Sequence, residues 1–402
     1  MSGLDARGGA AQGASIPLLR TFESRRFRLI VATFLALLGV AVNLMRLTMF
    51  DAGEGWAFDF AAYYHAAERM LAGASPYTAM LLASPVVEYC FDCYKYPPFF
   101  AQILSPLTLV PLEAAKVIWL AIGYAAAFAS TWLATGIGGA NKSLERAIWC
   151  LAAVTLFEPV SSAVWNGNVG TIGALGVTLV AMGGVAAGVG AGVVTLLKVA
   201  PVTLLPAVIA STREARRALV GTLAVVIGSL FLLAPQAWLE YPVVLANLVG
   251  DSAPSDGNLA LGYAASEGGW GPGAVSVVRL ATLVTAGACI LASIWLARRR
   301  GGMPAAALLG TVAMLIIPGT LWLHYLVVLL PFAAMAWPRA RAGIRAVLLA
   351  SFVLVSLAAF MGNPPLWAYL GSAMSLTAAG WVVWPRRAGT QVTGAPLSPI
   401  AG

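Results

Sequence analysis

The chain has 402 residues, of which 60% are hydrophobic and only 10% are charged, and its formal net charge is +8. A water-soluble domain of this length could not cover so much apolar surface, so the composition excludes an ordinary soluble protein and indicates that the bilayer is the main solvent. The positive charge does not indicate nucleic acid, because the basic residues stand in small clusters between apolar runs, as signals of membrane topology do. We therefore expect no nucleic-acid partner.

Apolar runs recur along the chain, and roughly twelve of them approach the length of about 20 residues that a transmembrane helix needs. This predicts an all-α polytopic membrane protein, with one transmembrane domain over 27–384 between cytoplasmic tails at 1–26, expected to be disordered, and 385–402. The short run at 97–111 and the glycine-rich stretch 169–197 leave sidedness open between residues 97 and 210. The expected spans are 27–50, 97–111, 114–136, 146–164, 169–187, 190–210, 218–238, 273–297, 303–318, 320–337, 344–361 and 366–384.

Charged residues divide the connecting segments into two groups. Arginine clusters precede the first expected span and follow several later ones, which predicts that these segments are cytoplasmic. The carboxylates concentrate in 51–96 and 239–272, which we expect to be the two long external loops, and no acidic residue follows Glu267. These loops are where external chemistry is expected.

Two of the four cysteines stand close together in the first of these loops. Cys90 and Cys93 form Cys-Phe-Asp-Cys, and an oxidising exterior would permit a disulfide bond there. Zinc would need further ligands, and the chain has no second cysteine pair, so we expect no metal site. Cys150 and Cys289 lie in apolar runs and are expected to be packing residues.

The first external loop is expected to contain a helix that begins near Phe58. Gly73 and Pro76 mark its expected end. On this helix Asp59 and Tyr63 share one face. The simplest interpretation is an amphipathic helix that lies on the outer membrane interface.

Asp59 has two interpretations. It would be favoured as the N-cap of this helix, where its carboxylate complements the helix dipole. Alternatively, it is a carboxylate at the mouth of a membrane cavity, where aromatic neighbours and little water would raise its pKa toward the range of a general base. Further along the loop, Pro97 and Pro98 suit the first turn of the next span.

A series of short motifs follows between residues 55 and 335. They are Asp59 with Tyr63-Tyr64, Gly73-x-x-Pro76-Tyr77, Tyr96-Pro97-Pro98-Phe99 with Pro106, Asn166-Gly167-Asn168 followed by Lys198-x-x-Pro201, and Pro318-x-x-x-Trp322-x-His324-Tyr325. In this order they resemble glycosyltransferase family 87, which includes polyprenol-phosphate-mannose-dependent α-1,2-mannosyltransferases and related arabinofuranosyltransferases. Tyr325 stands where a second histidine is frequent in the family, and Ile317 replaces a common serine.

The resemblance implies a C-type glycosyltransferase fold with a polyprenyl-phosphate-linked sugar as donor. Asp59 would be the general base that deprotonates an acceptor hydroxyl, and transfer would invert the anomeric configuration. Mannose is the favoured sugar, arabinofuranose is the second candidate, and the acceptor would be an extracytoplasmic glycan or glycolipid. No cofactor is expected, and the site would face outward from the cytoplasmic membrane.

Other residues are expected to bind the substrates. His324 would contact donor phosphate or sugar, although a lone histidine in an apolar run also suits simple packing. Lys198 would bind phosphate, or it would snorkel to an interface as an anchor while Lys95 served as the phosphate-facing cation. Asn166 and Asn168 would bind sugar hydroxyls or satisfy broken helix ends. The full set of expected substrate-binding residues is Tyr63, Lys95, Tyr96, Asn166, Asn168, Lys198, Trp322, His324 and Tyr325.

Two further functions stay open. A secondary transporter would use a similar set of spans, although no duplication of two halves is apparent. An envelope binding or assembly protein with a degenerate site is the third hypothesis, against which the presence of Asp59 and His324 argues. The sequence assigns no role to Glu158, which stands in an apolar run before Pro159.

Overall fold

A computed structural model describes residues 24–49, 56–83, 93–233, 235–249, 257–360 and 365–385. The secondary structure in these ranges is entirely helical, which confirms the expected all-α class. The first helices are α2 (Arg25–Met49), α3 (Phe58–Leu71), α4 (Ala79–Ala83), α5 (Pro98–Leu104), η1 (Ser105–Leu109), α6 (Leu112–Ile137), α7 (Leu144–Leu156), α8 (Glu158–Trp165), α9 (Gly170–Met182) and α10 (Gly184–Leu197). They are followed by η2 (Ala200–Leu204), α11 (Leu205–Ala210), α12 (Arg213–Leu233), α13 (Pro235–Val249), α14 (Leu261–Glu267), α15 (Pro272–Ala297), α16 (Met303–Ile316), η3 (Leu323–Val328), α17 (Leu329–Ala336), η4 (Trp337–Arg339), α18 (Ala342–Phe360) and α19 (Pro365–Val383).

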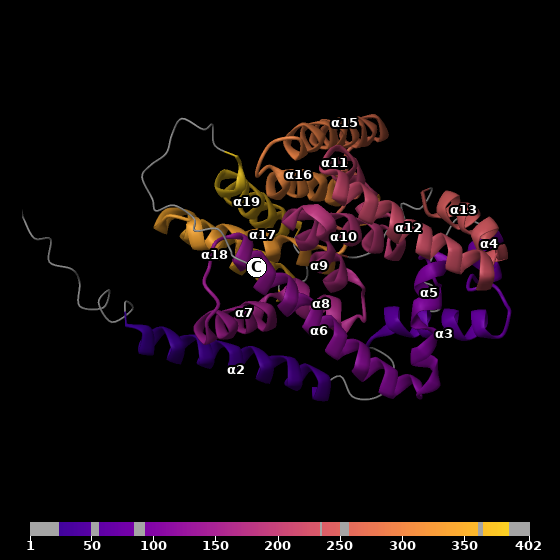
Figure 1. Cartoon of the computed structure of the whole chain (residues 1–402), viewed down its shortest axis with the longest axis horizontal. Coiled ribbons are helices and arrows are strands. Elements are labelled where there is room, and N and C mark those ends of the chain that lie inside the picture. The colour runs from indigo at the N-terminus through magenta and orange to yellow at the C-terminus, as the bar shows by residue number, and fades with distance from the viewer. Residues whose placement is uncertain are drawn as a thin grey trace, which may run out of the picture.

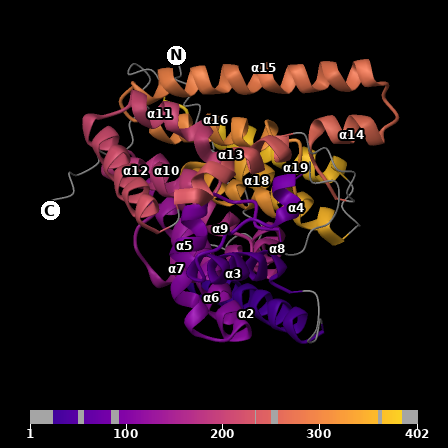
Figure 2. The same cartoon turned by 90° about the vertical axis from the view of Figure 1, so that its right-hand side faces the viewer.

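The helices pack around a central group that includes α9, α10, α16 and α17, whose apolar side chains contribute to the largest buried cluster. The long helices α2 and α15 lie on opposite sides of this group in both views (Figure 1 and Figure 2). Both present large apolar side chains outward, for example Phe34 at 63% exposure and Leu291 at 69%. Such surfaces suit contact with lipid rather than water.

Among the described residues, four helices, α2, α6, α15 and α19, are long and apolar enough to cross a membrane. A fifth span results if α7 and α8, which meet at a bend of 65°, are taken together. These correspond to the expected spans at 27–50, 114–136, 273–297, 366–384 and 146–164. The remaining apolar helices are shorter, so the full count of about twelve spans stays a prediction.

The glycine-rich stretch folds differently from the expectation. Spans at 169–187 and 190–210 would divide it between residues 187 and 190, but α10 runs unbroken through that point. The helices are separated instead at Gly183, with φ 80°, and at Lys198, whose backbone is extended. A positive φ favours glycine, which has no Cβ. The expected close packing is confirmed at Gly192, where a Cβ would lie 2.9 Å from Thr222 Cγ2 of α12.

The region around residues 218–272 also departs from the expected pattern. The expected span at 218–238 covers parts of two helices, because α12 ends at Leu233 and α13 begins at Pro235. Proline is well suited to the start of a helix and poorly suited to its interior. The expected loop at 239–272 contains α14 and most of α13 in the described ranges, while its side of the membrane stays a prediction.

Candidate functional site

The start of α3 is held by the C-terminal end of α8 and the residue that follows it. Asp59 N–H donates to the carbonyl of Asn166 at 3.0 Å, and Ala57 N–H donates to the carbonyl of Trp165 at 2.7 Å. Ala57 is the N-cap, in the left-handed conformation with φ 54°, and no side chain caps the helix. The N-cap interpretation of Asp59 is therefore wrong, because the backbone of the α8 loop satisfies these donors. The expected end of the helix is confirmed, since α3 stops at Leu71.

Close packing at Gly167 brings these two segments together. Its φ is +68°, and a Cβ there would lie 2.7 Å from Phe60 Cβ and 3.1 Å from Ala57 Cα. Trp119 Nε1 donates to the Gly167 carbonyl at 2.8 Å, and its ring stacks on Phe60 with centroids 5.3 Å apart. Glycine is required here by conformation and by space.

The carboxylate of Asp59 points to Asn168. Asn168 Nδ2 donates to Asp59 Oδ2 at 2.6 Å and lies 3.4 Å from the Tyr96 hydroxyl. The Asn168 carbonyl Oδ1 accepts the Gly170 N–H at 2.9 Å, which fixes the orientation of the amide at the start of α9. Asn168 is 4% exposed. It is a rigid donor toward the carboxylate, because both ends of its amide are bonded.

Opposing effects act on the pKa of the Asp59 carboxyl. Burial raises the pKa of its carboxyl above the ordinary value, while the hydrogen bond from Asn168 and the charges of Lys198 and Lys95 lower this pKa. The net direction is upward. A raised carboxyl pKa is what proton abstraction near neutral pH requires.

Lys198 is the C-cap of α10, and its side chain extends into the site. It follows the last residue of α10 in an extended conformation, and its Nζ is 3.3 Å from the centre of the Tyr325 ring and 5.9 Å from that of Tyr96. Its charge acts on Asp59 and on His324. This cation–π placement fits an anion-binding role better than that of a snorkelling anchor.

His324 brings a polar atom into the same region. Its ring is 7% exposed, and Nδ1 lies 3.3 Å from Asn166 Nδ2. Because the amide nitrogen donates, the neutral imidazole carries its proton on Nε2. Nε2 is buried and has no hydrogen-bond partner within the part of the chain that the structure describes. A buried donor without a partner is unusual in a packed interior and suits a ligand contact.

The structure brings together most of the expected site residues. Tyr63 packs edge-on against Tyr96 with centroids 4.8 Å apart. Lys95 is half-buried, and its charge reaches Asp59. Trp322 precedes η3, where its carbonyl accepts the Tyr325 N–H at 2.9 Å, and its role in substrate binding stays a prediction.

In the segment before α5, Cys93 is disulfide-bonded. Cys150 in α7 and Cys289 in α15 are free. The expected pairing partner, Cys90, lies outside the described residues. Pro98 is the first residue of α5, as the two prolines predict. The disulfide and this proline turn precede Phe100, which packs against the Tyr63 ring with centroids 4.8 Å apart.

Sequence reasoning missed Asn258, which supports the His324 segment. Its side chain is 2% exposed, its Oδ1 accepts the N–H groups of Ala260 and Leu321 at 2.9 Å each, and its Nδ2 donates to the Gly319 carbonyl at 3.2 Å. These bonds fix the turn that leads to Trp322 and His324. The local sequence carries no signal for this role, because two of its partners, Gly319 and Leu321, are 61 and 63 positions further along the chain.

A small apolar cavity of about 50 Å³ lies beside the cation. Its lining includes Gly173, Val194, Pro201, Leu315, Tyr325 and Lys198. The cavity therefore joins a hydrocarbon-compatible wall to a single positive charge. Within the described ranges, no three histidine, cysteine or acidic side chains gather in a way that could hold a metal ion.

Comparison with known families gives one match. The model of glycosyltransferase family 87 matches residues 94–318, more than half of the chain. The matched region contains Tyr96, Asn168 and Lys198, whereas Asp59 and His324 lie outside it. Among curated proteins, none matches the sequence.

Proposed function

The chain belongs to glycosyltransferase family 87 and is a membrane glycosyltransferase, and we propose that it transfers one sugar from a polyprenyl-phosphate carrier. The acceptor is a glycan or glycolipid on the outer side of the cytoplasmic membrane. Mannose is the favoured sugar, with arabinofuranose second. The observation that carries the proposal is the convergence of three side chains: the carboxylate of Asp59, the half-buried cation of Lys198, and His324 Nε2, which has no hydrogen-bond partner among the described residues.

Asp59 is the general base of the proposed reaction. Asn168 occupies Oδ2, so Oδ1 is the oxygen that accepts the proton of the acceptor hydroxyl. The hydroxyl oxygen then forms a bond to the anomeric carbon, and the bond from that carbon to the phosphate oxygen breaks with its electron pair on the phosphate. Attack opposite the leaving group inverts the configuration.

Lys198 and His324 stabilise the departing phosphate. The Lys198 ammonium supplies a positive charge, and the His324 Nε2–H supplies a hydrogen bond that no residue in the described ranges accepts. Preorganised groups of this kind are worth most where negative charge develops in a site shielded from water. No metal ion is needed for this step, because the two side chains carry the required charge and donor.

The apolar cavity next to Lys198 suits the lipid part of the donor. Gly173 and Val194 of α9 and α10 line it together with Leu315 of α16. A polyprenyl phosphate has a hydrocarbon chain joined to a negatively charged phosphate. An apolar cavity with a positive charge at its edge can therefore accept the chain while the charge binds the phosphate. We infer that the isoprene units closest to the phosphate bind here.

The test is transfer from a radiolabelled polyprenyl-phosphate sugar by membranes that contain the full chain. Asp59→Asn is expected to lower transfer by roughly 10²–10⁴-fold, the range of general-base catalysis, without loss of folded protein. Glu68→Gln is the matched control, because Glu68 is an exposed acid on the same helix. The mass added to the acceptor distinguishes a hexose from a pentose.

Near-normal transfer by Asp59→Asn would remove Asp59 as the base. Substrate counterflow in proteoliposomes, without a transfer product from any of the lipid-linked sugars, would support the transporter alternative instead.

A further inference from the structure

The chain bends sharply at the junction of α7 and α8, far from the base itself. α7 ends at Leu156, α8 begins at Glu158, and their axes differ by 65°. In a continuous helix the Thr155 carbonyl would accept the N–H of the residue four positions later, but Pro159 has no N–H. Asn43 Nδ2 of α2 donates to this carbonyl at 2.8 Å. A side chain from another helix thus replaces the bond that the proline removes.

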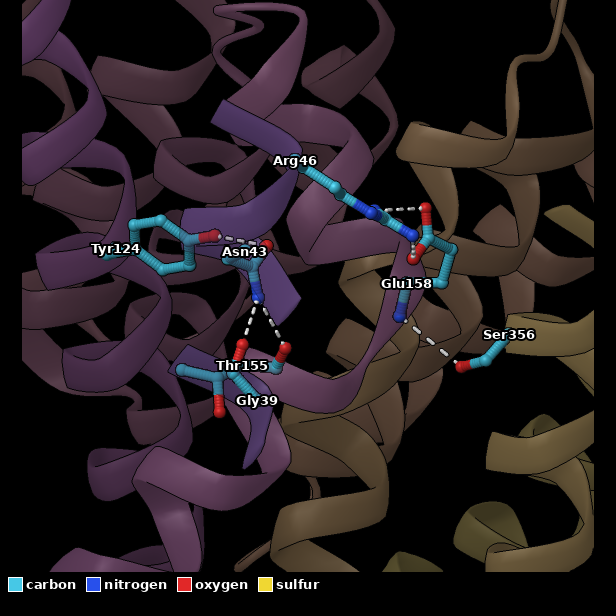
Figure 3. A network of polar contacts seen from close by, with 7 residues as sticks. All are labelled: Gly39, Asn43, Arg46, Tyr124, Thr155, Glu158 and Ser356. Carbon is cyan, nitrogen blue, oxygen red and sulfur yellow. Dashed lines mark hydrogen bonds and ion pairs between the residues drawn. The ribbon is translucent and has the colours of Figure 1, made fainter. Parts of the chain in front are cut away.

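A partly buried ion pair lies at the same bend. Arg46 of α2 binds the Glu158 carboxylate with two nitrogens, at 2.8 Å to Oε1 and 2.7 Å to Oε2. Glu158 is 9% exposed, and its backbone N–H donates to Ser356 Oγ of α18 at 3.3 Å. Figure 3 shows the guanidinium of Arg46 and the carboxylate of Glu158 facing one another across the junction. Such two-point contacts fix orientation as well as distance.

The remaining contacts lock α2 onto this junction. Tyr124 of α6 donates to Asn43 Oδ1 at 2.8 Å, beside the Asn43 contact to Thr155 (Figure 3). Gly39 allows α2 and α7 to approach closely, because a Cβ at Gly39 would collide with Thr155 Oγ1. We call Asn43, Arg46, Tyr124, Thr155 and Glu158 the junction cluster. It ties three helices to the first turn of α8.

The C-terminal end of α8 leads into the candidate site. The helix has eight residues, about 12 Å of axial length, and it runs directly into Asn166 and Asn168. These residues contact His324 and Asp59, and the carbonyl of Asn166 holds the start of α3. Because a short helix is stiff, a tilt at Glu158 moves both amides.

We propose that the junction cluster is a positioning device and that Arg46 and Glu158 are positioning residues for the transfer reaction. They set the direction of α8 and thereby the location of Asn166 and Asn168 against Asp59. The proposal rests on the proposed function for its kinetic consequence. A merely stabilising role is a weaker account, because ion pairs add little net stability both at the surface and in the interior, where apolar residues of similar volume do as well.

The first test compares Glu158→Gln with Glu145→Gln. Glu145 pairs with Arg28 at 2.7 Å and also links α2 with α7, but its position is at the opposite end of α7 from the junction. Glu158→Gln is expected to lower kcat roughly tenfold or more, with KM changed less than twofold, because misplacement of catalytic groups lowers rate more than binding. The control is expected to keep kcat within twofold. Arg46→Lys, which retains the charge but loses the two-point contact, is expected to fall between wild type and Glu158→Gln.

The second test is hydrogen exchange of the purified full chain. The Ala57 and Asp59 amides donate to carbonyls of the α8 loop, so Glu158→Gln is expected to speed exchange in a peptide that covers 56–61. Glu145→Gln is expected to leave that peptide unchanged. Equal behaviour of the two glutamine variants in rate and in exchange would overturn the proposal. Failure of the wild-type chain to transfer sugar would instead count against the proposed function, and the exchange result would still decide the positioning role.

Discussion

A polar cluster lies at each end of α8, and the two clusters differ in how far their side chains are paired within the protein. At the first end, the junction cluster pairs the carboxylate of Glu158 with Arg46 and the amide of Asn43 with Thr155 and Tyr124. At the second end, His324 Nε2 is buried without a partner in the described part of the chain, and Lys198 Nζ lies over an aromatic ring. Paired groups hold a shape, whereas unpaired groups are expected to meet a ligand. We therefore assign positioning to the first end of α8 and ligand binding to the side chains that surround its second end.

The sharpest test of this contrast removes one cation from each end. Lys198→Met is expected to lower transfer by roughly 100-fold or more, because it removes charge stabilisation from the leaving phosphate, while stability stays unchanged or rises. Arg46→Met is expected to lower the free energy of unfolding by about 3–5 kcal/mol, because it leaves the Glu158 carboxylate buried and unpaired. Transfer rates and thermal unfolding in detergent measure the two effects. Equal losses of stability in both variants would break the comparison.

Gly167→Ala tests the contact between α3 and the α8 loop. The new methyl group would collide with Phe60, and alanine would have to adopt a positive φ. We therefore expect transfer to fall by roughly 30-fold or more as the Asp59 segment shifts. Gly139→Ala is the matched control, because Gly139 also has a positive φ, +87°, but open space around its Cβ position. Backbone strain of about 1 kcal/mol is common to both variants. An equal effect on transfer would mean that strain alone, not displacement, explains the result.

Asn168→Ala tests the tuning of the base. The Asn168 hydrogen bond lowers the pKa of Asp59 against the upward effect of burial, so its loss raises that pKa further. Because the base must be deprotonated, activity falls as pH drops through this pKa, and the acidic limb of the pH–rate profile is expected to move to higher pH. At the pH optimum we expect about a tenfold loss from imperfect orientation. An unchanged limb would show that Asp59 does not control it.

Gly173→Leu tests the lipid cavity with the smallest expected effect. No heavy atom lies within 4 Å of a Cβ built at this position, so leucine is expected to enter the cavity without disturbing α9. The KM for the lipid-linked donor is expected to rise several-fold with little change in kcat, because lost uniform binding acts on KM. Gly287→Leu in α15 is the control, since its Cβ position is also open. A rise in KM in both variants would argue against the cavity as the lipid site.

The parts of the fold that were predictable from the sequence are those with a local signal. The helix from Phe58 and its end near Gly73 follow from residue pattern and turn chemistry, and α5 begins at Pro98 as its missing N–H favours. Hydropathy locates the long spans but averages over short interruptions. The breaks at Gly183 and Lys198 were missed for this reason, because apolar residues continue on both sides of each.

The site shows the same limit. The motif order predicted which residues belong together, and the structure gathers Asp59, Asn168 and Lys198. It did not predict how Asp59 is held, because its backbone partner is in a loop that follows α8. The pairing of Arg46 with Glu158 joins residues separated by 112 positions, and no local pattern contains it. Long-range side-chain pairs are set by packing, which periodicity does not encode.

The short helix α8 fixes the distance and the rotation between Glu158 and Asn168. One inserted or deleted residue would rotate everything beyond it by about 100° and shift it by about 1.5 Å, so neither end could compensate for the other. Substitutions on the surface of α8 leave this distance and rotation unchanged. In a set of relatives we therefore expect the spacing between the positions of Glu158 and Asn168 to stay constant even where the residues between them vary.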